Sequence, residues 1–244
     1  LNHNTISKKG IKNNTENNPR DGPFDGKRRI FPKIIEENIS YEGEWKDGKR
    51  DGLGILYYDN QLKCRKSGSD HDTKNSDSSW KYNEDNDKNK GVKALFKGNW
   101  SNDKQNGFGL EQWENSSYCG EYIDGNKNGI GILKFEEKAR YEGEFNKGNI
   151  SGVGTFFFKD KRKYQGEWKN NKMDGYGFII WPDNNYFEGQ FVEDKKNGFG
   201  VFNNDNNYFI GIWKDDNLHG NVIVIENGVI KKQLWENGKP IKVK

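Results

Sequence analysis

The chain has 244 residues, of which 32% are charged and only 31% hydrophobic, and its mean hydropathy is −1.16. A thick multilayered core is not expected from this composition, whereas aromatic residues, at 14%, are too frequent for a chain that is disordered throughout. The net charge of +3 lies mainly in residues 1–40 and 62–93, so the remainder is slightly acidic. That balance argues against a broad surface for nucleic acid, which requires many basic side chains.

Cysteine content and hydropathy restrict the setting of the chain. Cys64 and Cys119 are the only cysteines, too few for a disulfide framework or a zinc site, so we expect a reduced, cytoplasmic environment. No apolar run approaches the roughly 18 residues of a membrane span, and no secretory pattern opens the chain. The first residue is Leu rather than Met, which is consistent with a piece of a longer protein.

In chain order, patterned segments alternate with segments that lack a pattern. Residues 1–40 are rich in Asn and Lys and show little periodicity, so they are predicted to be disordered. Residues 41–61 form the first patterned unit. Residues 62–93 again lack periodicity and are predicted to be a disordered low-complexity insertion. The pattern then resumes over residues 94–240, and residues 241–244 form a tail.

The patterned segments repeat one motif, an aromatic-x-Gly-x-aromatic triplet followed by Gly-x-Gly. From the second copy on, the leading aromatic recurs every 22 or 23 residues. The triplets are Tyr41, Gly43, Trp45; Phe96, Gly98, Trp100; Tyr118, Gly120, Tyr122; Tyr141, Gly143, Phe145; Tyr164, Gly166, Trp168; Phe187, Gly189, Phe191; and Phe209, Gly211, Trp213.

The second half of the unit is present in six copies and altered in the seventh. The glycine pairs are Gly52 and Gly54, Gly107 and Gly109, Gly129 and Gly131, Gly152 and Gly154, Gly175 and Gly177, and Gly198 and Gly200. The seventh unit has Gly220 followed by Val222, and a partial eighth unit surrounds Trp235 and Gly238. Atypical terminal units are common in repeat proteins, where they cap the stack.

The motif Y-x-G-x-W-x-x-G-x-x-x-G-x-G resembles the MORN repeat, the membrane occupation and recognition nexus motif. The resemblance covers residues 41–61 and 94–240. It implies β-hairpins that act as scaffolding, dimerising or membrane-associating modules, with any catalysis in a separate domain. The family was first associated with phospholipid binding, so the resemblance also implies a lipid contact. Protein contacts and oligomerisation are the roles now favoured for the family.

The spacing predicts the hairpin independently of the resemblance. Alternate residues of a strand share a face, so Tyr41, Gly43 and Trp45 point one way while Glu42 and Glu44 point into water. The glycines leave room for rings to lie across the backbone. One such hairpin buries too little to be stable alone, so stacking is required. We therefore predict an all-β fold: one elongated, single-layer, twisted antiparallel sheet of about seven stacked hairpins plus a partial C-terminal one.

No reaction centre is predicted. The three histidines, at positions 3, 71 and 219, belong to no catalytic or zinc-binding pattern. Asp85, Asp87 and Asn89 resemble the start of a calcium-binding loop, but Lys90 and Phe96 stand where that loop needs Gly and Glu. We therefore expect no catalytic residue, no cofactor and no metal.

Two basic clusters are candidate contacts for an anionic lipid surface or a partner. Lys159, Lys161, Arg162 and Lys163 follow Phe156-Phe157-Phe158, and aromatics beside cations suit such a surface. Lys195 and Lys196 form the second cluster, which the hairpin pattern places at the opposite sheet edge. The alternative interpretation is that these lysines and arginines lie in solvated turns, where their charge discourages edge-to-edge aggregation.

A glutamate recurs in the first strand of several units, as Glu44, Glu121, Glu144 and Glu167. A row of carboxylates could suggest metal binding, but we predict that each pairs with a lysine across strands.

A long repetitive surface without a reaction centre serves for binding. We therefore expect a non-enzymatic scaffold that binds protein partners, with self-association to a homodimer as one form, near the cytoskeleton or a membrane-linked structure. Two alternatives stay open: a peripheral phosphoinositide-binding module, and a regulatory arm of an enzyme whose catalytic domain lies outside these residues. Binding to anionic phospholipid is expected to be weak or absent, and no nucleic-acid partner is expected.

Overall fold

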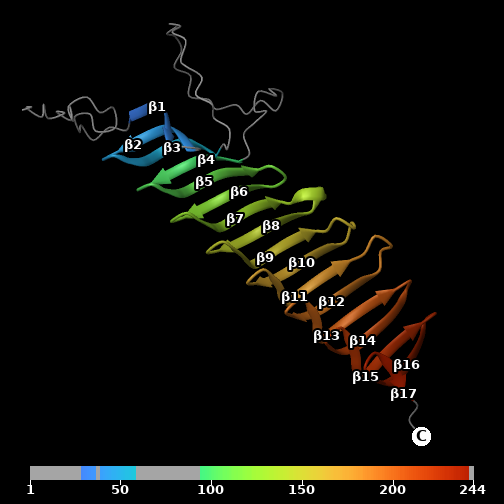
Figure 1. Cartoon of the computed structure of the whole chain (residues 1–244). Coiled ribbons are helices and arrows are strands. Elements are labelled where there is room, and N and C mark those ends of the chain that lie inside the picture. Colours follow the sequence, from blue (N-terminus) through green and yellow to red (C-terminus); the bar gives the residue numbers. More distant parts are fainter. Residues whose placement is uncertain (1–28, 37–38, 59–93, 242–244) are drawn as a thin grey trace, which may run out of the picture.

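The protein is an elongated stack of β-hairpins, which runs from the N-terminal to the C-terminal end of the sheet in sequence order (Figure 1). The computed structural model describes residues 29–36, 39–58 and 94–241. Over these residues it is a single open antiparallel sheet of 17 strands, and its one helical element is a short 3₁₀ turn, η2 (Glu136–Lys138). The predicted all-β, single-layer sheet is confirmed.

Every strand pairs antiparallel with the next strand in the chain, so the order of the strands in the sheet is their order in the sequence. The strands are β1 (Arg29–Glu36), β2 (Ile39–Lys46), β3 (Lys49–Tyr58), β4 (Ala94–Ser101), β5 (Lys104–Trp113), β6 (Ser117–Ile123), β7 (Asn126–Lys134), β8 (Arg140–Asn146), β9 (Asn149–Phe157), β10 (Lys163–Lys169), β11 (Lys172–Ile180), β12 (Tyr186–Val192), β13 (Lys195–Asn204), β14 (Asn207–Lys214), β15 (Asn217–Glu226), β16 (Val229–Glu236) and β17 (Lys239–Ile241).

The prediction that all of residues 1–40 are disordered is wrong at its C-terminal end. Residues 29–36 form β1, which pairs with β2 and satisfies backbone groups that β2 would otherwise present at an open edge. The register shifts between Phe31 and Ile34, and Pro32 lies in this interval, where a residue without a backbone N–H interrupts no ladder bond. Residues 1–28 and the predicted insertion at 62–93 lie outside the described residues.

Two-residue turns join the strands within each repeat. At the first turn Asp47 has φ 49° and Gly48 has φ 73°, and positive φ at both central residues is the hairpin geometry that matches strand twist. The second turn residue also links neighbouring repeats. The backbone N–H of Asp194 donates to the carbonyl of Met173 at 2.9 Å, and Asp194 Oδ1 accepts from the N–H of Met173 at 2.8 Å.

The core is a ladder of rings on one face of the sheet, here called the ring face. Thirteen rings contact one another in sequence, edge to face, with centroids 5.0–5.5 Å apart and interplanar angles of 77–90°. In order along the sheet they are Trp45, Tyr41, Trp100, Phe96, Tyr122, Tyr118, Phe145, Tyr141, Trp168, Tyr164, Phe191, Phe187 and Trp213. Contacts between two rings of one strand alternate with contacts to a ring of the next hairpin, so the ladder connects neighbouring hairpins. The edge-to-face geometry is favourable for aromatic pairs.

The glycines provide the space in which the rings lie. Gly143 and Gly154 face each other across β8 and β9, and the ring of Tyr141 lies over both. A Cβ atom on Gly154 would lie within 2.5 Å of three atoms of the Tyr141 side chain, two of the ring and the hydroxyl oxygen. Because the ring sits against bare backbone, Tyr141 is fully buried even though the sheet is a single layer.

The seventh repeat breaks the ladder at the position where its sequence departs from the motif. Val222 faces Gly211 in place of a second glycine and is 1% exposed, so it fills the space that a ring occupies elsewhere. Phe209 is accordingly only partly buried, and its ring contacts those of Phe202 and Trp235 instead. The ladder of edge-to-face contacts ends at Trp213.

Candidate interaction face

The face opposite the ring face is called the open face here, because nothing in the described sheet packs on it. The residue between the two glycines of each repeat points to this side, and in six successive repeats it is apolar and 48–66% exposed. This apolar stripe consists of Leu53, Phe108, Ile130, Val153, Tyr176 and Phe199. Single exposed apolar residues are ordinary on a protein surface, but a regular row of six is a feature of interaction sites.

A bulge in the second strand of each repeat shapes the open face beside the stripe. At Gly175 the backbone has φ +111°, and the register shifts between Gly166 and Trp168 of the preceding strand. A bulge leaves one backbone N–H without a ladder partner. Here the N–H of Tyr176 donates instead to Glu167 Oε1 at 3.0 Å.

Other repeats use the same device. The N–H of Ile130 donates to Glu121 Oε1 at 3.5 Å, and the N–H of Phe199 donates to Gln190 Oε1 at 2.9 Å. The prediction that the recurring glutamates pair with lysines is therefore wrong for Glu121 and Glu167. Neither side chain forms an ion pair within the described residues, because its place over the bulge glycine directs it to the backbone.

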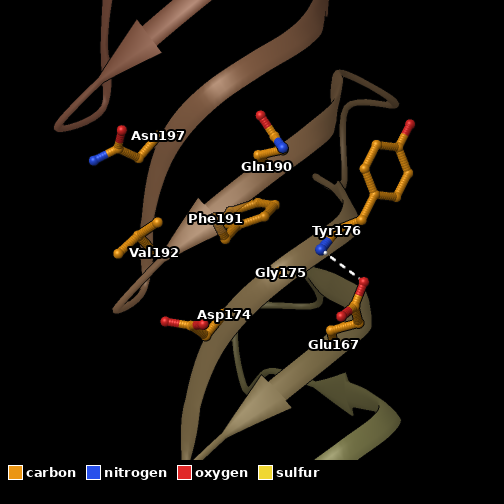
Figure 2. Close-up of a pocket in the computed structure, with 8 residues that line it drawn as sticks. All are labelled: Glu167, Asp174, Gly175, Tyr176, Gln190, Phe191, Val192 and Asn197. Carbon is orange, nitrogen blue, oxygen red and sulfur yellow. Dashed lines mark hydrogen bonds between the residues drawn. The ribbon is translucent and has the colours of Figure 1, made fainter.

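A shallow hollow of about 390 Å³ lies on the open face beside the stripe, between β10 and β13 (Figure 2). Glu167 and Tyr176 stand at one end of it, joined by the hydrogen bond described above. It is lined by Glu167, Asp174, Gly175, Tyr176, Gln190, Phe191, Val192 and Asn197. Two carboxylates and an exposed ring thus border the same depression.

Comparison with protein families identifies the repeat. The MORN repeat profile matches seven segments that together cover more than half of the chain. The chain belongs to the MORN-repeat family. The matched segments are residues 41–63, 96–117, 118–138, 141–161, 164–186, 187–206 and 209–221. A comparison with curated proteins gives no match.

The last MORN repeats carry a second apolar feature on the open face, here called the C-terminal patch. Where earlier repeats place Glu121, Glu144 or Glu167, the seventh repeat has Ile212. Its side chain lies across from the stripe residue Phe199. The patch comprises Ile210, Ile212, Ile223, Ile225 and Ile230, which the strand register brings together. The missing glutamate is the sequence signal that would have revealed it.

The predicted basic cluster at residues 159–163 lies in the loop between the fourth and fifth MORN repeats. Lys159 pairs with Glu137, and Arg162 donates to Asp160 Oδ2 at 2.8 Å and lies over the ring of Phe158. Lys161 is exposed and forms no ion pair within the described residues. Lys163 lies 5.7 Å from the ring centroid of Phe157. Part of the positive charge is therefore matched locally.

Lys195 and Lys196 lie at the opposite edge of the sheet, beside the turn that joins β12 and β13. Lys195 pairs with Asp215 at 3.3 Å. Lys196 instead points into the ring face, where its Nζ lies 4.6 Å from the ring centroid of Trp213 and near three further rings. Burial lowers the pKa of Lys196, although the nearby Asp216 opposes the shift. Because side chains alternate along β13, Lys195 and Lys196 point to different sides and do not form one basic cluster.

Side chains that could ligate a metal ion do not cluster within the described residues. Over residues 29–36, 39–58 and 94–241, no three His, Cys, Asp or Glu side chains are grouped so that they could hold a metal ion. The side chain of His219 lies exposed in β15 and has no hydrogen-bond partner within the described residues. The same part of the chain contains no helix long and apolar enough to span a membrane.

Proposed function

We propose that this MORN-repeat chain is a non-enzymatic scaffold that binds protein partners through its open face. The apolar stripe is the observation that carries the proposal, because six large side chains in a row are held in water by a sheet that already has a complete core on its other face. MORN repeats are commonly modules for protein or membrane interaction and are generally not catalytic.

One partner in this proposal is a second copy of the chain, joined through the C-terminal patch. The patch lacks the carboxylates that border the rest of the stripe, so two copies could approach there without bringing like charges together. Such a contact would also cover Ile230, which is 68% exposed.

The test is the molar mass of the purified chain by light scattering over a range of concentrations. We expect a dimer that dissociates in the Ile212→Glu variant. Earlier repeats carry Glu at this position, so the substitution suits the fold. Asn99→Glu, at the equivalent position of the second repeat, is the matched control and should leave the mass unchanged. A strict monomer at high concentration would contradict self-association, and the absence of any other captured protein partner would contradict the scaffold.

A second candidate is binding to an anionic membrane, and exposed Lys161 beside the phenylalanines of β9 favours it. Flotation with vesicles that contain phosphoinositide separates the two functions. Reversing the charges of Lys161, Arg162 and Lys163 should abolish co-flotation under this candidate, whereas absence of binding at every salt concentration would end it. A location at the cytoskeleton or a membrane-linked structure remains part of the proposal, which microscopy of a labelled chain would test.

A further inference from the structure

We propose that the central part of the apolar stripe, from Phe108 to Tyr176, binds a basic amphipathic segment of a partner protein. This inference rests on the proposed protein-binding function and adds the chemistry of the partner. Two features of the open face carry it: the spacing of the apolar side chains, and the carboxylates fixed between them.

The first feature is a regular alternation along the sheet. The register places Phe108 across from Glu121, Ile130 across from Glu144, and Val153 across from Glu167. Apolar and acidic side chains therefore take turns on successive strands. Since neighbouring strands are ~4.8 Å apart, like side chains recur about every 10 Å.

That spacing fits an α-helix laid along the stripe. One heptad of a helix rises about 10.5 Å, so a helix of three heptads can place one apolar side chain on each of the four stripe residues from Phe108 to Tyr176 in turn. The four stripe residues of this central part expose on the order of 400 Å² of side-chain surface, taking half of roughly 200 Å² for each. This is about half of the ~800 Å² that each partner commonly contributes to a stable interface, and the side chains between the stripe residues would supply the rest.

The second feature selects the charge of the partner. Glu167 is exposed, and its Oε1 is held by the backbone N–H of Tyr176, while its Oε2 has no hydrogen bond within the described residues. Glu121 is held in the same way by Ile130. A carboxylate fixed before binding loses little side-chain entropy when it meets a cation, so a row of them favours Lys or Arg on the flank of the helix.

The hollow beside Tyr176 adds a specific contact. Glu167 and Asp174 border it together with the exposed Tyr176 ring (Figure 2). A lysine or arginine side chain that reached past the stripe would find the Glu167 carboxylate and the Tyr176 ring at one end of the hollow, a combination that suits a cation, whereas the Asp174 carboxylate points to the other side (Figure 2). The cations Lys134, Arg140 and Lys163 lie further toward the loop edge, and Arg140 is already paired with Glu142.

The test uses two synthetic peptides of about three heptads, each with Leu at positions a and d. One carries Lys at e and g, and the other carries Glu there, so each peptide repels its own copies. Fluorescence anisotropy of the labelled peptides measures binding to the whole chain at about 50 mM and about 500 mM NaCl. We expect the Lys peptide to bind at low salt and to weaken at high salt, and the Glu peptide to bind at least about tenfold more weakly.

Two triple variants locate the site. Glu121→Gln, Glu144→Gln and Glu167→Gln together remove the charge but keep an acceptor for the backbone, as Gln190 does naturally. These three substitutions should lower the affinity for the Lys peptide about tenfold, since each exposed ion pair contributes about 0.5 kcal/mol. Glu114→Gln, Glu136→Gln and Glu236→Gln remove the same charge from exposed positions away from the stripe and should change affinity less than about twofold.

The outcomes separate this inference from the proposed function. Equal binding of both peptides, lost in an Ile130→Ser, Val153→Ser variant, would keep the stripe as a protein-binding face and overturn the preference for a basic partner. Binding of neither peptide to the folded chain would overturn the inference entirely. The proposed self-association would still be decided by the mass measurement with Ile212→Glu, which does not involve these residues, and the scaffold function by the capture of protein partners.

Discussion

At the scale of single residues, the fold depends on pairs of glycines that face each other under one ring. The ring of Tyr141 cannot move away from Gly154, because Phe145 and Trp168 hold it from both sides at centroid distances of 5.3 and 5.5 Å. Glycine normally weakens a strand because it has no side chain to pack. Here the side chain of another residue packs in its place, so the usual cost is offset.

Gly154→Ala should therefore be strongly destabilising. Its Cβ would overlap a ring that is fully buried, and overpacking of this kind costs about 2–3 kcal/mol. Urea denaturation followed by tryptophan fluorescence measures the change in the free energy of unfolding. Gly211→Ala is the matched control and should cost less, because the nearest atoms there are 3.1 Å away and no ring lies over that glycine. Equal losses at both sites would contradict the role assigned to the rings.

The buried hydroxyls of the ladder make stability sensitive to alkali. Burial raises the pKa of Tyr141 to about 12, and burial also raises the pKa of Tyr41, Tyr118 and Tyr164. Above pH 10 an unfolded tyrosine loses its proton while the folded one keeps it, so the unfolded state is favoured. The sign is opposite for Lys196, whose lowered pKa adds stability as pH rises toward 10.5.

We predict that the free energy of unfolding falls above pH 10 by about 1.4 kcal/mol per pH unit for each such tyrosine. Tyr141→Phe should reduce this slope by one tyrosine's share, at a cost of about 1 kcal/mol at pH 7 for the hydrogen bond to the carbonyl of Glu144. Phe96 and Phe187 occupy the same position in other repeats, so the variant suits the ladder. Urea titrations at several values between pH 8 and pH 11 measure the slope. An unchanged slope in the variant would show that Tyr141 ionises normally.

At the scale of the hairpin, the bulge couples the ring face to the open face. The positive φ of Gly175 turns the second strand, and the side chain of Glu167 completes the hydrogen bonding that the bulge disrupts. The same glutamate then presents its second oxygen to solvent. A residue that is needed for the hairpin is thus available for binding as well.

Substitutions at Glu167 should separate these two roles. Glu167→Ala should lower the free energy of unfolding by about 1 kcal/mol, because the N–H of Tyr176 loses its acceptor. Glu167→Gln should be nearly neutral, since Gln190 accepts the equivalent N–H of Phe199 at 2.9 Å. Thermal and urea unfolding of both variants provides the comparison. If Ala and Gln cost the same, the bulge does not depend on this acceptor.

At the scale of the whole molecule, the sheet is a one-dimensional array in which each hairpin contacts only its neighbours (Figure 1). Stability in such arrays is close to a sum of repeat and interface terms, so length can change without loss of the fold. The short edge strand β17 contains Lys239 and Pro240, which discourage further strands from adding there.

Removal of one full repeat should therefore leave a shorter folded array. Deleting residues 141–163 joins Arg140 to Tyr164 and keeps every remaining strand in its native direction. Small-angle scattering should show a maximum dimension about 10 Å smaller, which is two strand spacings. Deleting residues 149–162 removes only β9 and its loop, reverses the strands that follow, and should unfold the C-terminal half. Retention of a cooperative fold by that second variant would contradict the array.

Much of this architecture could be predicted because it depends on local spacing. Tyr41, Gly43 and Trp45 share a face because alternate residues of any strand do, and Asp47-Gly48 defines a two-residue turn by its positive φ. The strand β1 could not be predicted, because its residues lack the motif and it forms by pairing with β2. The partners of Glu121 and Lys196 depend on a bulge and on rings from other repeats, and neither is visible in a local pattern.

The sequence alone therefore determined the repeat, the hairpins and the single-layer sheet, since a period of 22 or 23 residues with fixed glycines allows one packing of rings on backbone. Only the tertiary structure decided which side chains lie opposite one another once the strands are in register. In the structure, Glu167 accepts a hydrogen bond from the N–H of Tyr176, and the stripe residues from Leu53 to Phe199 lie in one row. Val222 fills the space over Gly211, so Phe209 is only partly buried. The physical reason is that the face on which a side chain lies depends only on alternation along its own strand. The contacts made at a bulge or in the shared core depend on residues of other strands.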